Sequence, residues 1–217
     1  MALFVICFLD NDILLKLSAF DLLDEIIAAL HIDSENLRVL DTARFVFSSN
    51  RMVTRKYSQS VRDRAIQFVN NCQPVIVSDC DEFDVLTQLL DVGEATLVMA
   101  TLDSDSFILM TGDKRCLQTV ATRPEIADAY ERLQGRVICL EQVLLRLIRS
   151  VGFEVVKARV IVAWDCDTAI KACFGSGMAA TEAQVVDALD GYIEALRQDA
   201  PGLLADLSGS EGLNFRA

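Results

Sequence analysis

Short apolar runs alternate with amphipathic stretches along the chain. Residues Leu3–Leu9 form a continuous apolar run, which is typical of a central strand in a parallel sheet that is covered on both faces. Four further strands are expected at Asn36–Leu40, Pro74–Asp79, Phe107–Thr111 and Arg136–Leu140. The apolar pattern therefore predicts a sheet of five strands.

Helical periodicity fills the intervals between these strands. In segment 18–30, Phe20, Leu23, Ile27 and Leu30 recur at helical spacing with acids on the other side, which predicts one amphipathic helix. Further helices are expected at Val61–Asn70, Asp84–Leu90, Gly93–Leu102, Glu125–Leu133 and Glu141–Val151. Alternating strands and helices predict an α/β domain with a central parallel sheet over residues 1–150.

The pattern changes after Val151, so residues 151–217 are expected to form a mainly helical C-terminal extension. Segment 157–164 fits either a strand or a buried helix. Segment 181–196 predicts an amphipathic helix that begins with a capping box between Thr181 and Gln184. Its apolar face should pack on protein, and we expect the domain of the same chain, a second copy in a homodimer or a regulatory protein to cover it.

Composition narrows the class of protein. The 217 residues are 52% apolar and carry a formal charge of −12, which argues against bulk attraction to nucleic acid but permits a local basic patch. Seven cysteines without a C-x-x-C pair predict buried reduced thiols, and a single histidine makes a structural zinc site a poor prediction. No apolar run has the ~20 residues of a membrane helix and no leader pattern opens the chain, so we expect a soluble cytoplasmic protein.

Three carboxylates occur at positions where α/β sheets usually have their ligand-binding site. Asp10 follows the first strand, Asp113 follows the strand Phe107–Thr111, and Glu94 lies in the first turn of an expected helix. Ligands of open α/β sheets bind outside the carboxyl ends of the strands. Converging carboxylates repel one another unless a cation neutralises them, so a Mg²⁺ or Mn²⁺ site is expected here.

Each acid also has a purely structural interpretation. Asp91 and Glu94 have the spacing of a capping box, and Asp113 could close the turn after Gly112. Asp12 is expected to cap a helix that begins at Ile13, which we favour over a role as a metal ligand.

The three acidic motifs resemble those of the PIN-domain nucleases. An apolar strand that ends in Asp (FLDNDILLKL), a helix start written Gly-Glu-Ala in one subgroup (LDVGEATLVMATL) and a strand that ends in Thr-x-Asp (ILMTGDKRCL) follow in this order over roughly residues 3 to 145. The resemblance implies a PIN-like three-layer fold and a metal-dependent ribonuclease. It implies catalytic and metal-binding roles for Asp10, Glu94 and Asp113.

Two other function classes stay open. The segment FLDNDILL also resembles the Asp-x-Asp start of haloacid-dehalogenase-like phosphatases, in which the first Asp is a nucleophile and the second a general acid or base. A PIN-like domain that has lost cleavage and serves as a binding scaffold is the non-enzymatic alternative.

One basic stretch could bring RNA to the acidic site. In RMVTRKYSQSVRDR, Arg51, Arg55 and Lys56 stand beside Tyr57, with Arg62 and Arg64 further along. Basic side chains can contact phosphates and a tyrosine can stack on a base. We expect Arg51, Arg55 and Lys56 to bind RNA, although a solvated helix face would explain the same residues.

Overall fold

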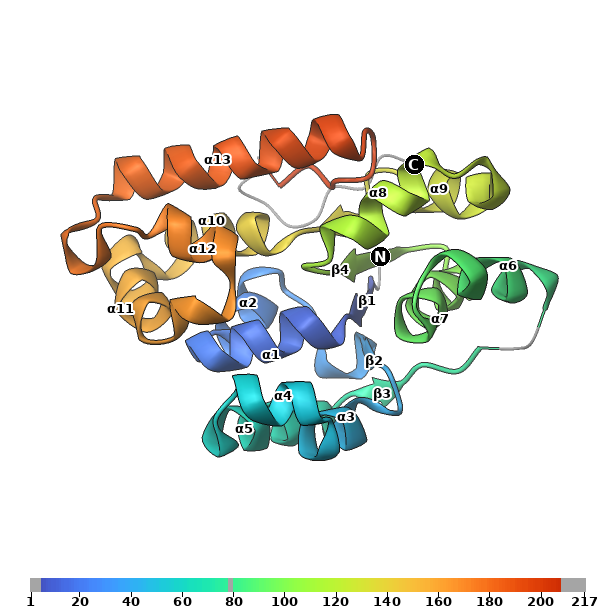
Figure 1. The fold of residues 1–217 in the computed structure, drawn as a ribbon, viewed down its shortest axis with the longest axis horizontal. Helices are drawn as coiled ribbons and strands as arrows, with labels where there is room; N and C mark the ends of the chain where they lie inside the picture. Colours follow the sequence, from blue (N-terminus) through green and yellow to red (C-terminus); the bar gives the residue numbers. More distant parts are fainter. Residues whose placement is uncertain (1–4, 78–79, 208–217) are drawn as a thin grey trace.

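The structure is a computed structural model and describes residues 5–77 and 80–207. At its centre is a parallel sheet in the order β3-β2-β1-β4-β5 (Figure 1). The strands are β1 (Ile6–Leu9), β2 (Leu37–Val39), β3 (Gln73–Pro74), β4 (Phe107–Met110) and β5 (Val137–Ile138). Helices flank the sheet, so the predicted three-layer α/β fold with a helical extension is confirmed.

The central strand is β1, as the unbroken apolar run predicts. It pairs with β2 on one side and β4 on the other, and its residues from Cys7 to Leu9 are buried. Part of the predicted strand, Leu3 and Phe4, lies outside the described residues. Burial on both faces explains why this strand shows no alternation of polar and apolar positions.

The predicted strand Pro74–Asp79 is much shorter in the structure. β3 comprises Gln73–Pro74, followed by one more hydrogen bond from the Val75 N–H to the Val39 carbonyl at 2.8 Å. Ser78 and Asp79, the expected strand end, lie outside the described residues. Pro74 has no N–H to donate, which suits an edge strand.

The single helix predicted over residues 18–30 is wrong. The chain forms α1 (Asn11–Phe20) and α2 (Leu23–Ala29), separated at Asp21, whose φ of 58° is left-handed. The Leu22 N–H returns to the Leu17 carbonyl at 3.0 Å, which closes α1 as a helix end. Both helices share the apolar periodicity, so the pattern alone does not reveal the break.

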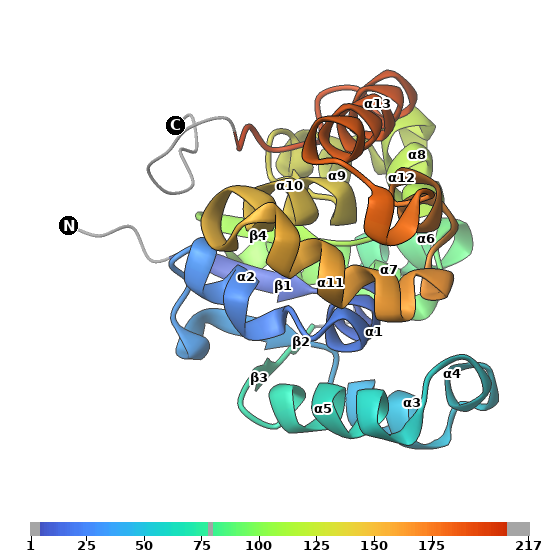
Figure 2. The same ribbon diagram turned by 90° about the vertical axis from the view of Figure 1, so that its left-hand side faces the viewer.

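The remaining helices of the sheet domain lie between and after the strands. Three of them have no counterpart in the prediction, namely α3 (Ala43–Ser49), α4 (Arg51–Lys56) and α8 (Lys114–Thr122). The others are α5 (Gln59–Val69), α6 (Asp81–Leu89), α7 (Val92–Ala100), α9 (Ala127–Leu133) and α10 (Leu140–Val151). Short 3₁₀ turns occur at η1 (Ser34–Asn36), η2 (Thr101–Asp103) and η3 (Pro124–Ile126). Figures 1 and 2 place α3, α4 and α5 beyond the β3 edge of the sheet and α13 at the opposite end.

The extension consists of α11 (Phe153–Ala163), η4 (Trp164–Cys166), α12 (Thr168–Cys173), η5 (Gly177–Ala179) and α13 (Glu182–Asp199). Segment 157–164 therefore continues a helix rather than forming a strand. The predicted capping box between Thr181 and Gln184 is confirmed at the start of α13.

The apolar face of α13 is buried within its own chain. Val185, Leu189, Ile193 and Leu196 are at most 4% exposed, and α13 packs on α8, α10 and α12. The prediction that this face packs on protein is confirmed. Because the chain itself covers it, the face is not available to a second copy or to a regulatory protein.

The chain returns to the sheet after α13. The Val137 N–H donates to the Leu203 carbonyl at 3.0 Å, and the Ala205 N–H donates to the Val137 carbonyl at 2.7 Å, which adds a parallel bridge beside β5. The edge of β5 is therefore covered by a segment from the far end of the described chain.

The strand order defines where ligands are expected. The chain runs from β1 to β2 and β3 on one side, then crosses to β4 and β5 on the other, so the order reverses between β1 and β4. Crevices at the carboxyl ends of such strands are the usual ligand sites of open α/β sheets. Within the described part of the chain, no helix is both long and apolar enough to cross a membrane.

Candidate active site

Asp10 lies at the point where the strand order reverses. It follows β1, takes the N-cap position of α1 and is 9% exposed. Its Oδ2 accepts a hydrogen bond from the Thr111 hydroxyl at 3.1 Å, and Thr111 follows β4, the neighbouring strand. The Thr111 Oγ1 accepts in turn from the Asp113 N–H at 3.0 Å. The residues that end the two central strands are thus joined through one hydroxyl.

Burial shapes the acid–base properties of Asp10. Loss of hydration, followed by the negative charge of Asp12, raises the pKa of Asp10 from 3.8 to about 7, while the hydrogen bond from Thr111 opposes the rise. The charge of Asp113 also contributes to raising this pKa. Asp10 is a carboxylate that a neighbouring cation would stabilise strongly.

Glu94 faces the same space from α7. A small cavity is lined by the side chains of Asp10, Glu94, Leu97, Val98, Leu109, Thr111 and Cys116. Burial comes first among the causes that raise the pKa of Glu94 to about 7, and the charges of Asp91, Asp113 and Asp10 add to it. Two carboxyl groups with raised pKa values therefore share one cavity.

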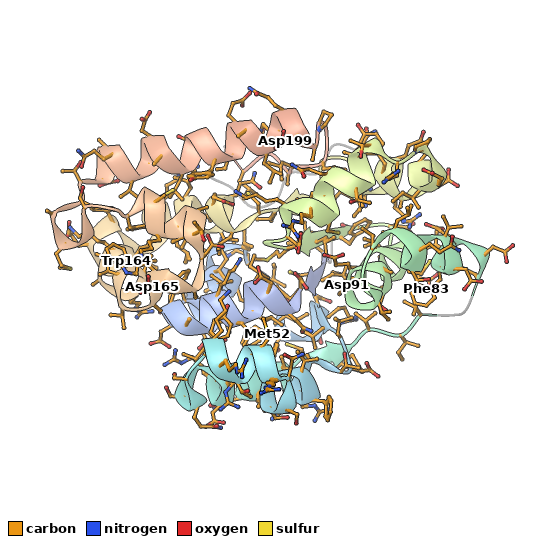
Figure 3. All side chains as sticks on the ribbon, viewed as in Figure 1. Met52, Phe83, Asp91, Trp164, Asp165 and Asp199 are labelled. Atoms are coloured by element: carbon orange, nitrogen blue, oxygen red, sulfur yellow. The ribbon has the colours of Figure 1, made fainter. Side chains whose placement is uncertain are left out.

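Glu94 also forms the predicted capping box. Its Oε2 accepts from the Asp91 N–H at 3.1 Å, and the Asp91 Oδ1 accepts from the Glu94 N–H at 2.9 Å. Asp91, at the start of α7, is labelled in Figure 3. The cap uses only the Oε2 of Glu94, so Glu94 can form the cap and still bind a ligand through its Oε1.

Asp113 is the N-cap of α8. Its Oδ1 accepts from the N–H groups of Arg115 and Cys116 at 2.8 and 3.1 Å. The structural role of this acid is therefore that of a helix cap rather than the predicted closure of a turn after Gly112. Its charge still acts on both Asp10 and Glu94.

The cavity offers two carboxylates, Asp10 and Glu94, and Asp113, the third metal ligand expected from the sequence, is not among its lining residues. No group of three or more His, Cys, Asp or Glu side chains is arranged to hold a metal within residues 5–77 and 80–207. Magnesium commonly binds through one or two carboxylates and completes its coordination with water and substrate phosphate. Asp10 and Glu94 are two such carboxylates on one cavity, and the charge of Asp10 contributes to the raised pKa of Glu94.

Asp12 does not cap a helix at Ile13. Asn11 already begins α1, and the Oδ2 of Asp12 lies 2.5 Å from the Lys16 ammonium one turn later. The same ammonium lies 2.7 Å from the Oδ2 of Asp167, the N-cap residue of α12. An acid of the extension therefore reaches the edge of the sheet where Asp10 lies.

The predicted RNA-binding residues lie together on α4. Arg51, Arg55 and Lys56 are exposed, and Lys56 lies 5.3 Å from the centre of the Tyr57 ring. The other two basic residues of this stretch serve the fold, since Arg62 donates to the Phe47 carbonyl and Arg64 pairs with Asp21. Exposed Met52 on the same helix is labelled in Figure 3.

The sequence interpretation missed three residues of this site. Thr111 was visible within the Thr-x-Asp motif but received no role. Lys16 was signalled by a charge inside the otherwise apolar stretch ILLKL, one helical turn after Asp12. Asp167 gave only the signal of a helix cap before TAIKAC, and nothing in the sequence connects it to Lys16.

Known proteins offer no match to this chain, whether they are compared as family models, as curated sequences or as solved structures. The chemistry of the site is therefore inferred from its geometry and its charges.

Proposed function

We propose that this protein is a ribonuclease that depends on Mg²⁺ or Mn²⁺ and cleaves RNA phosphodiester bonds at Asp10. One observation carries the proposal: a buried carboxylate at the strand-order reversal shares a cavity with a second carboxylate, Glu94. A bound divalent ion would supply an activated water and offset charge on the phosphate. Asp10 and Glu94 would hold the ion, and Asp113 would add negative charge beside it.

The protein's own groups prepare the site for this task. The Thr111 hydroxyl fixes the rotamer of Asp10, and the apolar side chains of Leu97, Val98 and Leu109 limit water around the carboxylates. Fixed charges act more strongly where water is excluded. RNA would be drawn to the acidic site by Arg51, Arg55 and Lys56 on α4.

The test of the site is Asp10→Asn, which keeps the shape and removes the charge. Cleavage of single-stranded RNA in Mn²⁺ should fall at least ~100-fold, a loss typical for removal of an electrostatic contributor. Asp103→Asn, which changes an exposed acid at the end of η2, is the matched control and should cleave at the wild-type rate. Wild-type cleavage by Asp10→Asn would exclude this site.

The RNA-binding surface is tested by changing Arg51, Arg55 and Lys56 together to Ala. Binding to RNA should weaken, and the slope of log affinity against log salt should flatten by about 2, since three phosphate contacts are lost at ~0.7 each. A variant with Arg123, Arg149 and Arg197 changed to Ala removes the same charge from other surfaces and should retain more of the slope. Equal slopes in both variants would show that the basic residues of α4 form a solvated helix face and not an RNA-binding surface.

The second candidate is a binding scaffold without cleavage. The caps made by Glu94 and Asp113 favour it, because these carboxylates have a structural function without any metal. A wild-type protein that binds RNA but neither binds Mn²⁺ nor cleaves would establish this role.

The phosphatase alternative is less well supported. Its second aspartate would act as a general acid or base, but Asp12 is paired with the Lys16 ammonium at 2.5 Å. Release of phosphate from a small phosphate ester would favour this class over the nuclease.

A cytoplasmic location belongs to the same proposal. All seven cysteines are unpaired, and Cys7, Cys116, Cys139, Cys166 and Cys173 are buried. Cys72 is half-buried and Cys80 is exposed, so the prediction of buried thiols holds for five of the seven cysteines. Unpaired thiols suit a reducing compartment.

A further inference from the structure

Lys16 is a buried cation held between two acids. Its ammonium lies 2.5 Å from Asp12 and 2.7 Å from Asp167, and its side chain is 8% exposed. Burial acts to lower the pKa of Lys16, but the two carboxylates together outweigh it, so the pKa lies above its ordinary value and the ammonium stays charged. The group of three carries a net charge of −1.

This group lies directly on the backbone of the candidate site. A Cβ atom built on Gly112 would lie 2.6 Å from the Oδ2 of Asp12 and 3.2 Å from the Lys16 ammonium. Gly112 stands between Thr111, which binds Asp10, and Asp113. Lys16 is therefore at the same carboxyl edge of β1 and β4 as the proposed catalytic carboxylate.

A buried polar group next to the acids is left without a partner. Tyr57 is 6% exposed, and its hydroxyl has no hydrogen-bond partner among the residues that the structure describes. Burial is the main cause of the raised pKa of Tyr57, and the charges of Asp12 and Asp167 add to it, so the hydroxyl lies within their field. Buried hydroxyls without a partner are rare in proteins and point to a ligand or a water molecule.

A purely structural role, in which the Lys16–Asp167 ion pair attaches the extension to α1, does not explain the unpartnered Tyr57 hydroxyl beside it. Lys16 and Asp167 are largely desolvated, with side chains 8% and 17% exposed, and the cost of desolvating charges makes buried ion pairs weak stabilisers. The extension has other attachments to the first two helices, including the Arg159 side chain, which pairs with Glu25 and donates to the Asp21 carbonyl.

We propose that Lys16 is the resident cation of this site and occupies, between Asp12 and Asp167, the position that a second divalent ion would take. The proposal deepens the proposed function, because phosphodiester cleavage with two ions uses clustered acids, and Asp12 lies beside Gly112 next to the strand end that carries Thr111. A lysine ammonium is a compact point charge and can replace one such ion. Asp167 makes the extension part of the site rather than an appendage.

The experiment counts Mn²⁺ ions by titration calorimetry. Lys16→Gln should bind one more Mn²⁺ per chain than the wild type, because Asp12 and Asp167 lose their internal cation. Lys16→Arg keeps the charge and should bind the same number as the wild type. In Lys16→Gln combined with Asp167→Asn, the additional ion should be lost. Equal Mn²⁺ counts in the wild type and in Lys16→Gln would overturn the proposal.

Thermal unfolding provides a second measurement, which tests the proposal even if Lys16→Gln folds poorly without a metal ion. Lys16→Gln should melt at a lower temperature than the wild type in EDTA and recover most of the loss in Mn²⁺. If it is unfolded in EDTA, Mn²⁺ should restore its circular dichroism, and failure to do so would contradict the proposal. The wild-type Mn²⁺ count tests the proposed function separately, since the inference concerns only the difference between the two proteins.

Discussion

At the scale of residues, the raised pKa of Asp10 links the candidate site to the stability of the fold. The carboxyl group holds its proton more tightly in the folded chain, with a pKa of about 7 against 3.8. Between these values the unfolded state binds fewer protons, so this group lowers stability as pH rises from about 4 to about 7. Above that window its effect is constant.

Replacing Asp10 with Asn should therefore remove this pH dependence. Relative to the wild type, Asp10→Asn should gain stability as pH rises from about 4.5 to about 7.5, by an amount of the order of a few kcal/mol. Urea unfolding at both pH values measures the difference, which includes a contribution of the same sign from Glu94, because the charge of Asp10 helps to raise the pKa of Glu94. Parallel pH profiles for the two proteins would show that Asp10 is not buried as described.

Gly112 leaves no room for a side chain beside Asp12 and Lys16. A methyl group there would lie 2.6 Å from Asp12, so Gly112→Ala should destabilise the fold by about 1–3 kcal/mol. Gly191, inside α13 with no atom within 4 Å of an added Cβ, is the control. Gly191→Ala should stabilise by about 0.5–1 kcal/mol, because alanine favours a helix interior. Melting temperatures that shift in the same direction for both variants would contradict the close approach.

At the scale of elements, the sequence predicted what periodicity and caps encode. The sheet strands, α10 and the capping boxes of α7 and α13 follow directly from such local signals. The break at Asp21 did not, because a left-handed residue leaves the apolar spacing of α1 and α2 intact. Helices α3, α4 and α8 were not predicted, and in α3 and α4 the exposed apolar residues Phe45 and Met52 interrupt the polar face.

The packing of α13 can be tested by truncating one core side chain. Leu189 is fully buried, so Leu189→Ala should lower the free energy of unfolding by about 2–5 kcal/mol. Val162→Ala on α11, where Val162 is 85% exposed, should change it by less than about 0.5 kcal/mol. Light scattering should show the same mass for both variants as for the wild type. A fall in mass upon Leu189→Ala would instead show that the helix joins two chains.

At the scale of the whole molecule, the candidate site is only partly predictable. Asp10 was identifiable because a carboxylate directly after a buried strand is costly unless a cation or hydrogen bonds stabilise it, and the strand order then places Thr111 beside it. Lys16 and Asp167 meet only through the packing of the extension on α1, a tertiary contact that no local pattern encodes. Sequence reasoning therefore identified the acids of the sheet and missed the cation between the sheet and the extension.

The segment that covers β5 has a consequence for synthesis on the ribosome. β5 gains its outer partner only when residues 203–205 reach it, after α13 has been made. Until then the growing chain presents an open sheet edge, to which a neighbouring nascent chain could pair. The sheet domain is encoded first but closed last, because the edge of β5 is covered by a segment that follows α13 in the chain.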